Sequence, residues 1–310
     1  MNLPNPFPVA RLRIEARVQR TVHWPDYEGS VLRGLWGHAL RTRFCATGQS
    51  NCEGCAVAPR CVYHQVFEPS VPAELRTYSD MTPPYVIEPA DGARQLTPGQ
   101  KYVFHLVLYG RALQALEQIL PTWHQALAQN IGPLRGAMKI EHIELVPPTS
   151  RGPSQPAHAW TTSEYAPQQV AIEILSPLYL KREGRPINPQ NFTAADFVWA
   201  TVRRVAEISE LHLRRPTGAN YAALKQASRQ LRFSDASWNL RSFNRWSNRQ
   251  KRHTPLFGVQ GHALLKGDLG PFWPFLQLGE VLHIGGKTSF GLGCYRLTPV
   301  ATPASETTTP

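Results

Sequence analysis

The segment best suited to bind an anion lies near the C-terminus of the chain. Residues 285–293 read GGKTSFGLG and contain four glycines and Lys287. Glycine permits positive φ and leaves its backbone N–H unshielded. Successive exposed amides form a concavity that binds anions, and a lysine adds a point charge. The segment therefore predicts a phosphate-binding loop, and the alternative is a tight turn between two elements.

A basic segment with interleaved aromatic residues precedes this loop. Residues 225–252 carry eight Lys or Arg side chains, and Asp235 is their only acid. In RNA-binding proteins cations pair with phosphates, and aromatic rings stack on unpaired bases. The alternative is a solvated charged face with its aromatic residues in the core. We expect RNA contacts from Arg232, Arg241, Arg245, Arg249, Lys251 and Arg252, together with Gly285, Gly286, Ser289, Gly291 and Gly293.

The secondary structure of this basic segment decides which arginines act together. If the segment is helical, Arg241, Arg245 and Arg249 share a face. If it is a strand, Arg241 and Arg245 lie on the same side as Phe243.

The charge of the whole chain agrees with a polyanionic partner. The net charge is +11 at pH 7, which favours nucleic acid or an anionic membrane surface. No apolar run approaches the roughly 18 residues of a membrane span, and the N-terminus does not resemble a signal peptide. We therefore expect a cytoplasmic protein that does not bind membranes.

Histidines could supply acid–base chemistry. Cleaving RNA without a metal needs a base for the 2′-OH, an acid for the leaving 5′-oxygen and a cation for the developing charge. The candidates are His38 on an expected helix, His23 just before it, and His283 just before the glycine-rich loop. A structural role is the alternative for each histidine. Metalloprotease, serine-hydrolase and Walker motifs are absent from the sequence, and its acids do not cluster as in two-metal nucleases.

Four of the five cysteines form a cluster at Cys45, Cys52, Cys55 and Cys61. The two residues between Cys52 and Cys55 are the usual spacing of a zinc knuckle, and a cytosolic cluster favours a metal over disulfides. The sequence thus predicts a structural zinc ion. An iron–sulfur cluster and unligated thiols are the alternatives.

Hydrophobic periodicity predicts two successive units of the same kind. In each, the expected order is strand, helix, strand, strand, helix, strand, which is the ferredoxin-like βαββαβ arrangement. The first unit has strands at 9–22, 84–88, 101–108 and 138–146, with helices at 29–44 (Ser30 as N-cap) and 111–129. The second has strands at 170–175, 231–240, 257–265 and 294–300, with helices at 193–213 (Thr193 as N-cap) and 272–282.

The predicted fold is therefore α+β, with two tandem ferredoxin-like (RRM-like) domains and a cysteine-rich insertion in the first. The expected bounds are 1–147 for the first domain with its cysteine cluster at 45–61, and 148–167 for a linker rich in Pro, Ser, Gly and Thr. The second domain is expected at 168–300, with the glycine-rich loop at 285–293. A disordered tail follows at 301–310.

Several motifs resemble those of a known family. They are Tyr27-x-Gly29-Ser30-x-Leu32-Arg33-Gly34-x-x-Gly37, the cysteine cluster ending in Cys61-x-Tyr63, Ser176-Pro177-Leu178, Arg245-x-Ser247-x-Arg249-Gln250, and the stretch from Leu278 to Gly293. Together they resemble the pre-crRNA-processing endoribonuclease of CRISPR systems, a member of the RAMP superfamily, in the branch that carries a cysteine cluster.

The resemblance implies a function and a set of catalytic residues. It implies binding of CRISPR repeat RNA, often as a hairpin, and metal-independent cleavage that leaves a 2′,3′-cyclic phosphate and a 5′-OH, with no cofactor for catalysis. It points to His38 as the catalytic histidine, with Tyr27, Arg33 and Lys287 as helpers and with His283 and His23 as alternatives. Other subunits of a CRISPR effector complex are expected as further partners.

A second hypothesis is a non-catalytic subunit that binds guide RNA within such a complex, and a cleavage assay separates the two. A third, weaker hypothesis is redox chemistry at the cysteine cluster, which a visible absorption band would support.

Overall fold

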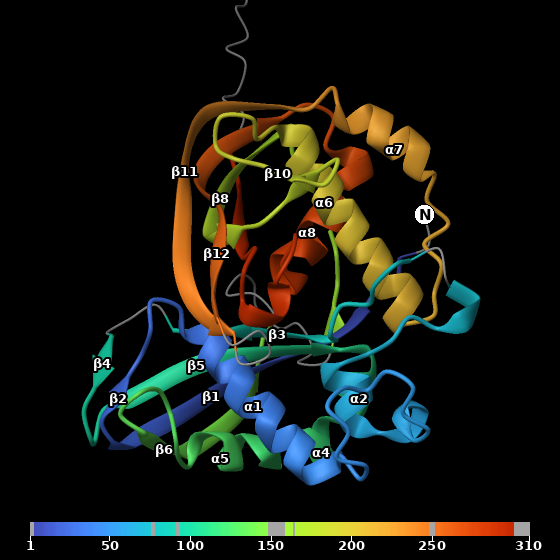
Figure 1. Ribbon diagram of the computed structural model, residues 1–310. Coiled ribbons are helices and arrows are strands. Elements are labelled where there is room, and N and C mark those ends of the chain that lie inside the picture. The colour runs from blue at the N-terminus through green and yellow to red at the C-terminus, as the bar shows by residue number, and fades with distance from the viewer. Residues whose placement is uncertain are drawn as a thin grey trace, which may run out of the picture.

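The computed structural model describes residues 3–75, 78–90, 94–147, 159–163, 165–247 and 252–300. Most of the predicted linker and all of the predicted tail lie outside them. The described elements form two antiparallel sheets, each packed against helices, one above the other in Figure 1. Within these ranges, every helix is too short or too polar to cross a bilayer.

The first sheet has the strand order β3-β5-β1-β6, and all of its neighbours are antiparallel. Numbered along the unit, this order is second, third, first, fourth, which is the ferredoxin-like arrangement. The strands are β1 (Phe7–Arg20), β3 (Tyr85–Glu88), β5 (Lys101–Tyr109) and β6 (Ala137–Val146). Helix α1 (Glu28–Phe44) connects β1 to β3.

The second sheet repeats this topology with the order β11-β12-β8-β13. Its strands are β8 (Gln169–Leu178), β11 (Arg232–Ser247), β12 (Arg252–Lys266) and β13 (Tyr295–Pro299). Its helices are α6 (Ala194–Glu207), α7 (Tyr221–Ser228) and α8 (Trp273–Leu282). The predicted pair of ferredoxin-like units is confirmed.

Shorter elements complete the chain. They are β2 (Val22–His23), α2 (Val62–Phe67), β4 (Gln95–Leu96), β7 (Ala159–Trp160), β9 (Lys181–Arg182) and β10 (Arg185–Pro186), with a π-helical turn at Ile208–His212 and 3-10 turns at Ala58–Arg60, Ala73–Leu75, Gly270–Phe272 and Thr288–Phe290.

Three details differ from the sequence prediction. The helix expected at 111–129 is divided into α3 (Gly110–Gln114), α4 (Leu116–Ile119) and α5 (Pro121–Leu127), and α5 begins at the proline because that residue has no N–H to continue a helix. The N-cap of α1 is Tyr27 and not Ser30, whose hydroxyl donates to the Tyr27 carbonyl oxygen at 3.2 Å. Strand β11 extends seven residues beyond the predicted 240 because it pairs with β12 over that length.

The first sheet buries side chains on both of its faces. On one face Leu12 and Ile14 pack with Trp36 and Trp123, whose rings stack at 4.9 Å. On the other face Phe7, together with neighbouring valines, joins the core of the second domain. The two domains therefore share an apolar interface.

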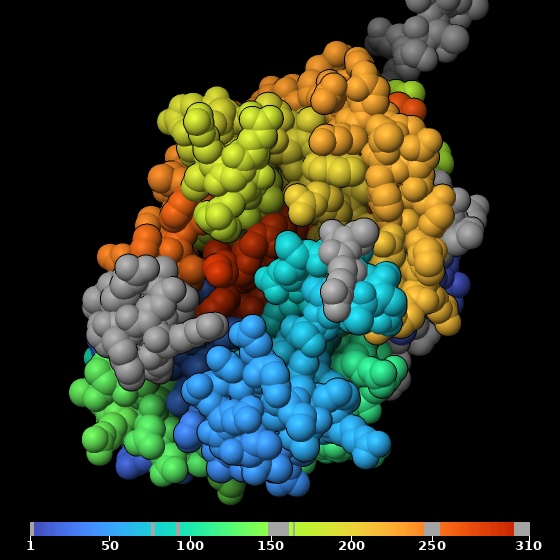
Figure 2. Space-filling view, turned by 45° about the vertical axis from the view of Figure 1, so that its right-hand side comes forward, coloured from blue at the N-terminus to red at the C-terminus, as the bar shows by residue number. Residues whose placement is uncertain are grey.

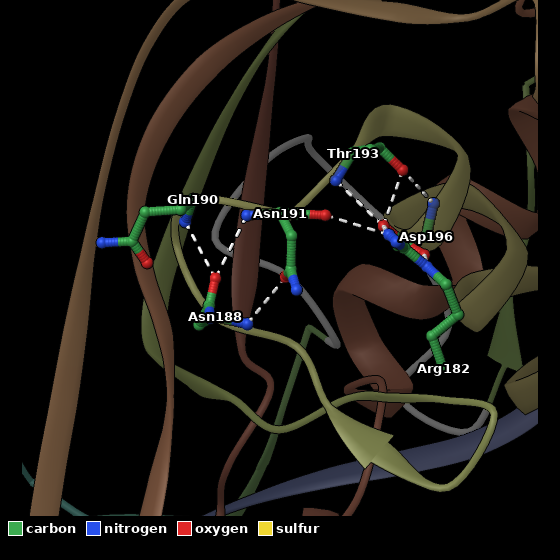
Figure 3. A network of polar contacts seen from close by, with 6 residues as sticks. All are labelled: Arg182, Asn188, Gln190, Asn191, Thr193 and Asp196. Carbon is green, nitrogen blue, oxygen red and sulfur yellow. Dashed lines mark hydrogen bonds and ion pairs between the residues drawn. The ribbon is translucent and has the colours of Figure 1, made fainter.

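The start of α6 is fixed by side chains that replace missing helix hydrogen bonds. The Thr193 hydroxyl accepts from the Asp196 N–H, and the Asp196 carboxylate accepts from the Thr193 N–H, which is a capping box. Arg182 on β9 donates to the same carboxylate and to the Asn191 carbonyl oxygen (Figure 3). This network ties the β9–β10 turn to the N-terminus of α6.

Candidate active site

The glycine-rich loop lies in the seam between the two domains. A Cβ at Gly291 would lie 2.3 Å from the Ile87 carbonyl oxygen of β3, and a Cβ at Gly29 would lie 2.0 Å from the Phe290 carbonyl oxygen. Gly291 also has a φ of 94°. These glycines are therefore required because the backbones of the two domains approach closely, and the loop is docked on the start of α1 and on β3.

Most of this loop is packed and does not form an open anion cradle. Gly291, Gly293 and Ser289 are buried, and the N–H groups of Gly291 and Gly293 donate to the carbonyl oxygens of Thr288 at 2.8 Å and Pro177 at 3.1 Å. Phosphate contacts from these three residues stay a prediction. The part of the loop that reaches the surface is Gly285 to Lys287.

Lys287 is exposed and has left-handed backbone geometry, with φ 67° and ψ 27°. For a residue with a Cβ this geometry costs roughly 1–2 kcal/mol. Such strain gathers at functional sites. The side chain of Lys287 thus stands at the exposed corner of the loop at a position where glycine would fit the backbone better.

His283 is buried, and both of its ring nitrogens face acceptors. Its side chain is 1% exposed; Nε2 lies 3.3 Å from Glu88 Oε1, and Nδ1 lies 3.2 Å from the Leu292 carbonyl oxygen. Burial by itself would lower the pKa of His283, but Cys294 and the Glu88 carboxylate outweigh burial and raise it to about 10. His283 thus links the two domains through buried polar contacts, and its role as an alternative acid–base catalyst stays a prediction.

Glu88, at the end of β3, is the partner that holds this histidine. Arg11 donates to its Oε2 through Nε at 2.8 Å. Burial by itself would raise the pKa of Glu88, but the hydrogen bond from His283 and the charge of Arg11 outweigh burial and lower it to about 2.

A buried arginine fixes the chain just before the glycine-rich loop. Arg204 of α6 is 3% exposed. It donates to the carbonyl oxygens of Leu282 and His283, both at 3.3 Å, and to the Tyr109 hydroxyl of the first domain at 2.8 Å. Arg204 is not among the residues predicted from the sequence, although an arginine on the apolar stripe of α6 indicates a buried charge with partners.

Tyr27 and Arg33 belong to the same seam. The Tyr27 ring stacks on Phe243 of β11 at 4.9 Å, and the two pack with Phe290 in an apolar cluster. The Arg33 guanidinium lies over the rings of Phe67 and Phe290, at 4.2 Å and 4.8 Å. Both residues thus hold α1 against the loop and the β11–β12 ribbon.

His38 lies on the open side of α1. It is exposed, and it stands about 13 Å along the helix axis from Gly29, where the loop docks. Gly34 is one turn before it on the same face, and among the described residues a Cβ there would have no neighbour within 4 Å. A substrate could therefore approach α1 closely beside His38. His23, the other alternative, is exposed on β2, which pairs with β4.

The basic segment starts at the end of α7 and is extended from Arg232 to Ser247 in β11, so the strand geometry holds for Arg241 and Arg245. Arg232 and Arg241 are exposed on β11, and the Arg241 guanidinium lies 5.3 Å from the Phe243 ring. Arg245 pairs with Thr254 through the backbone of the ribbon. Arg252 begins β12, while Arg249 and Lys251 fall outside the described residues.

Two hollows open along the seam. A cleft of about 680 Å³ is lined by Tyr27, Arg94, Arg241 and Phe243, between the start of α1 and the ribbon. A larger groove of about 930 Å³ is lined by α6, α7, the β9–β10 turn, Gly285 and Gly286. Figure 2 shows a hollow between the yellow-green and cyan segments, with the red C-terminal chain at its floor.

The cysteines lie on the loop between α1 and α2. The Thr47 hydroxyl lies 4.0 Å from the Cys45 sulfur and 3.6 Å from the Cys55 sulfur. Burial, with Glu68, raises the pKa of the Cys52 thiol to about 12, whereas zinc binds thiolates. In the described part of the chain no three ligand side chains gather around one point. The structural zinc ion stays a prediction that elemental analysis would test.

Comparison with known protein families accounts for nearly the whole chain. Residues 7–169 match the family model AF_1859_N, described as an N-terminal domain. Residues 172–295 match the model of the CRISPR-associated endoribonuclease Cas6. Residues 172–295 thus form a domain of the Cas6 endoribonuclease type. The expected resemblance to CRISPR-associated endoribonucleases is confirmed for this part of the chain.

Solved structures share the Cas6 fold at low sequence identity. A partial Cas6-RT-Cas1–Cas2 complex matches with a TM-score of 0.58 and 16% identity, over 97% of this chain and 47% of that one. The chain thus spans about half of that polypeptide, and 30% of the one in a second Cas6-RT-Cas1–Cas2 complex. Thermus thermophilus Cas6 matches at 0.52 and 15% identity, over 94% and 98% of the two chains.

A Cas6-related protein from Pyrococcus furiosus also matches at a TM-score of 0.52, with 11% identity over 94% of this chain and 98% of that one. At these identities the likeness is one of fold. No curated protein matches the chain.

Proposed function

We propose that this chain binds CRISPR repeat RNA and cleaves the precursor transcript without a metal ion. The observation that carries the proposal is the position of His38: it is exposed on α1, the helix whose first turn receives the glycine-rich loop. The match of residues 172–295 to an endoribonuclease family model supports RNA as the substrate, and a Cas6 structure of the same fold is described as a product complex.

In the proposed reaction the 2′-oxygen of the nucleotide before the cut attacks the adjacent phosphorus. The 2′-OH proton goes to a base, the 2′-O–P bond forms, and the P–O5′ bond breaks. The 5′-oxygen then takes a proton from an acid. The products are a 2′,3′-cyclic phosphate and a 5′-OH, so atoms and charge balance without water or metal.

The exposure of each side chain indicates its role in the cleavage reaction. His38 is the acid–base group, because it is exposed beside the open position at Gly34. Lys287 supplies positive charge from the exposed corner of the loop. Tyr27 and Arg33 fix the position of α1 relative to the loop. The Tyr27 ring packs with Phe290, and the Arg33 guanidinium lies over the Phe290 ring.

The repeat RNA is proposed to bind along the seam. Arg241 and Arg94 line the cleft on one side of it, next to the Phe243 ring. Charges of this kind attract the phosphate backbone, and binding should weaken with salt, with a slope of roughly −0.7 per phosphate neutralised on a single strand.

The test is cleavage of the cognate repeat RNA in EDTA. We expect one cut with a 2′,3′-cyclic phosphate at the new 3′ end. His38→Ala should slow the single-turnover rate by about 10²–10⁴-fold and preserve binding, and His23→Ala examines the alternative histidine. His142→Ala, an exposed histidine on β6 at the opposite edge of the first sheet from β3, is the matched control and should retain the rate.

Two results would overturn this reaction. Loss of cleavage on chelation would require a metal, and tight RNA binding without product would make the chain a non-catalytic RNA-binding subunit.

A further inference from the structure

The groove along α6 combines aromatic ring faces with lysines. Trp199 of α6 lies under the ammonium group of Lys225 from α7, with Nζ 5.7 Å from the ring centroid. Tyr179, next to β8, has Lys181 Nζ at 5.8 Å. All four residues line the groove, and both rings are partly exposed. Proteins that hold single-stranded nucleic acid combine these two groups, since a ring stacks on a base while a cation meets the phosphate.

The charges of the groove favour an anion. Its lining contains the basic residues Lys181, Arg182, Arg203, Arg204, Lys225 and Arg229 and the acids Asp80, Glu183, Asp196 and Glu207. Two of these acids are already engaged.

Asp196 accepts from Arg182, as Figure 3 shows, and Glu207 accepts from the Thr82 hydroxyl at 2.8 Å. Within the described chain Lys181, Arg203 and Lys225 form no ion pair. Three cations that line the groove are therefore outside the ion pairs of the described residues.

The shape of the groove favours an unpaired strand. Ala195 and Ala200 line the groove together with Trp199, so small side chains flank the partly exposed ring. A ring can stack on a base only when that base is not paired in a helix. Gly285 and Gly286 also line the groove, so it is continuous with the exposed corner of the loop that carries Lys287.

We propose that this groove holds the single-stranded RNA that continues from the folded part of the repeat. One base stacks on Trp199, with Lys225 and Arg203 on the neighbouring phosphates, and a second base is placed over Tyr179 with Lys181. The groove thus extends RNA recognition beyond the cleavage site. This inference rests on the proposed function, because it takes repeat RNA as the substrate.

The test compares three RNAs: the repeat hairpin alone, and the hairpin with a single-stranded extension of six nucleotides at its 5′ end or at its 3′ end. Binding of each is measured by the intact protein and by Trp199→Ala, Trp199→Phe and Lys225→Ala variants. Lys139→Ala, an exposed lysine on β6, is the charge control.

We expect Trp199→Ala to weaken binding of one extended RNA by about 5- to 150-fold more than it weakens binding of the hairpin alone, since that is the range of one base–aromatic stack. Trp199→Phe should recover most of this loss, and Lys225→Ala should reduce the salt slope for the same RNA, while Lys139→Ala should not.

The proposed RNA binding by this groove would be overturned if Trp199→Ala weakened the binding of all three RNAs equally, or if it weakened none of them. Failure of the unmodified protein to bind or cleave any repeat RNA would instead overturn the proposed function, so the two failures are distinguishable.

Discussion

Replacing Glu88 by Gln should reveal how strongly one buried ion pair holds the two domains together. The Glu88 carboxylate belongs to β3 of the first domain, and His283 stands at the end of α8 in the second. Both ring nitrogens of His283 face oxygen acceptors, at 3.3 Å and 3.2 Å, so both must carry a proton. Glu88→Gln keeps the size of the side chain and removes the charge that this imidazolium faces.

The expected cost follows from the pKa of the carboxyl group. Its pKa falls from an ordinary value of 4.5 to about 2, and at about 1.36 kcal/mol per unit this is roughly 3 kcal/mol of stabilisation. Breaking a buried pair by removing one partner costs a similar amount, about 3–5 kcal/mol. We therefore expect the variant to lose roughly 3 kcal/mol of unfolding free energy near pH 6.

The dependence on pH has a sign that can be worked out for each partner. The pKa of Glu88 is lowered, so its stabilisation is present above pH 4.5 and is lost as the pH falls toward 2. The pKa of His283 is raised from 6.5 to about 10, so its stabilisation is present below pH 6.5 and is lost as the pH rises through 10. The unmodified protein should thus lose stability between pH 6.5 and 10. Glu88→Gln should lose less over that interval because Glu88 no longer raises the pKa of His283, although Cys294 still raises it in the variant.

The assay is urea unfolding followed by near-UV circular dichroism between pH 4 and pH 10. Glu144→Gln is the matched control, because Glu144 forms an ion pair with Arg13 at 3.1 Å but its side chain is 55% exposed, and such pairs contribute about 0–1 kcal/mol. The reasoning is refuted if Glu88→Gln costs no more than Glu144→Gln, or if its stability declines above pH 6.5 as steeply as that of the unmodified protein.

Three further predictions concern the glycine-rich loop and the helix beneath it. Gly291→Ala should destabilise the protein by roughly 2–5 kcal/mol in thermal or urea unfolding, because a Cβ would meet the Ile87 carbonyl oxygen and the residue has positive φ; an unchanged midpoint would contradict the close approach. Gly34→Ala, in contrast, should stabilise α1 by about 0.5–1 kcal/mol, since the position is helical and open, and a loss of stability there would show that the site is crowded. Lys287→Gly should relieve roughly 1 kcal/mol of backbone strain while it slows RNA cleavage by about 10²-fold, and a variant that is both more stable and fully active would remove Lys287 from the mechanism.

The sequence by itself determined the elements and their order. Alternation of apolar residues along β1 and β5, and the apolar stripe of α6, follow from periods of about two and 3.6 residues, which are local properties. A βαββαβ order of elements is compatible with few strand arrangements in a sheet. Both units adopt the ferredoxin-like one. The motif at the glycine-rich loop indicated a CRISPR-associated endoribonuclease, and the Cas6 family model matches the residues that contain it.

Only the tertiary structure decided what the glycines and histidines near the seam do. A glycine that binds an anion and a glycine that admits a neighbouring backbone look the same in sequence, and Gly291 is of the second kind because Ile87, some two hundred residues away along the chain, lies against it. His283 and His38 are likewise the same residue type, but one is locked between Glu88 and Leu292 and the other is exposed on α1. Burial and partners come from packing between distant segments, and no local pattern in the chain encodes them.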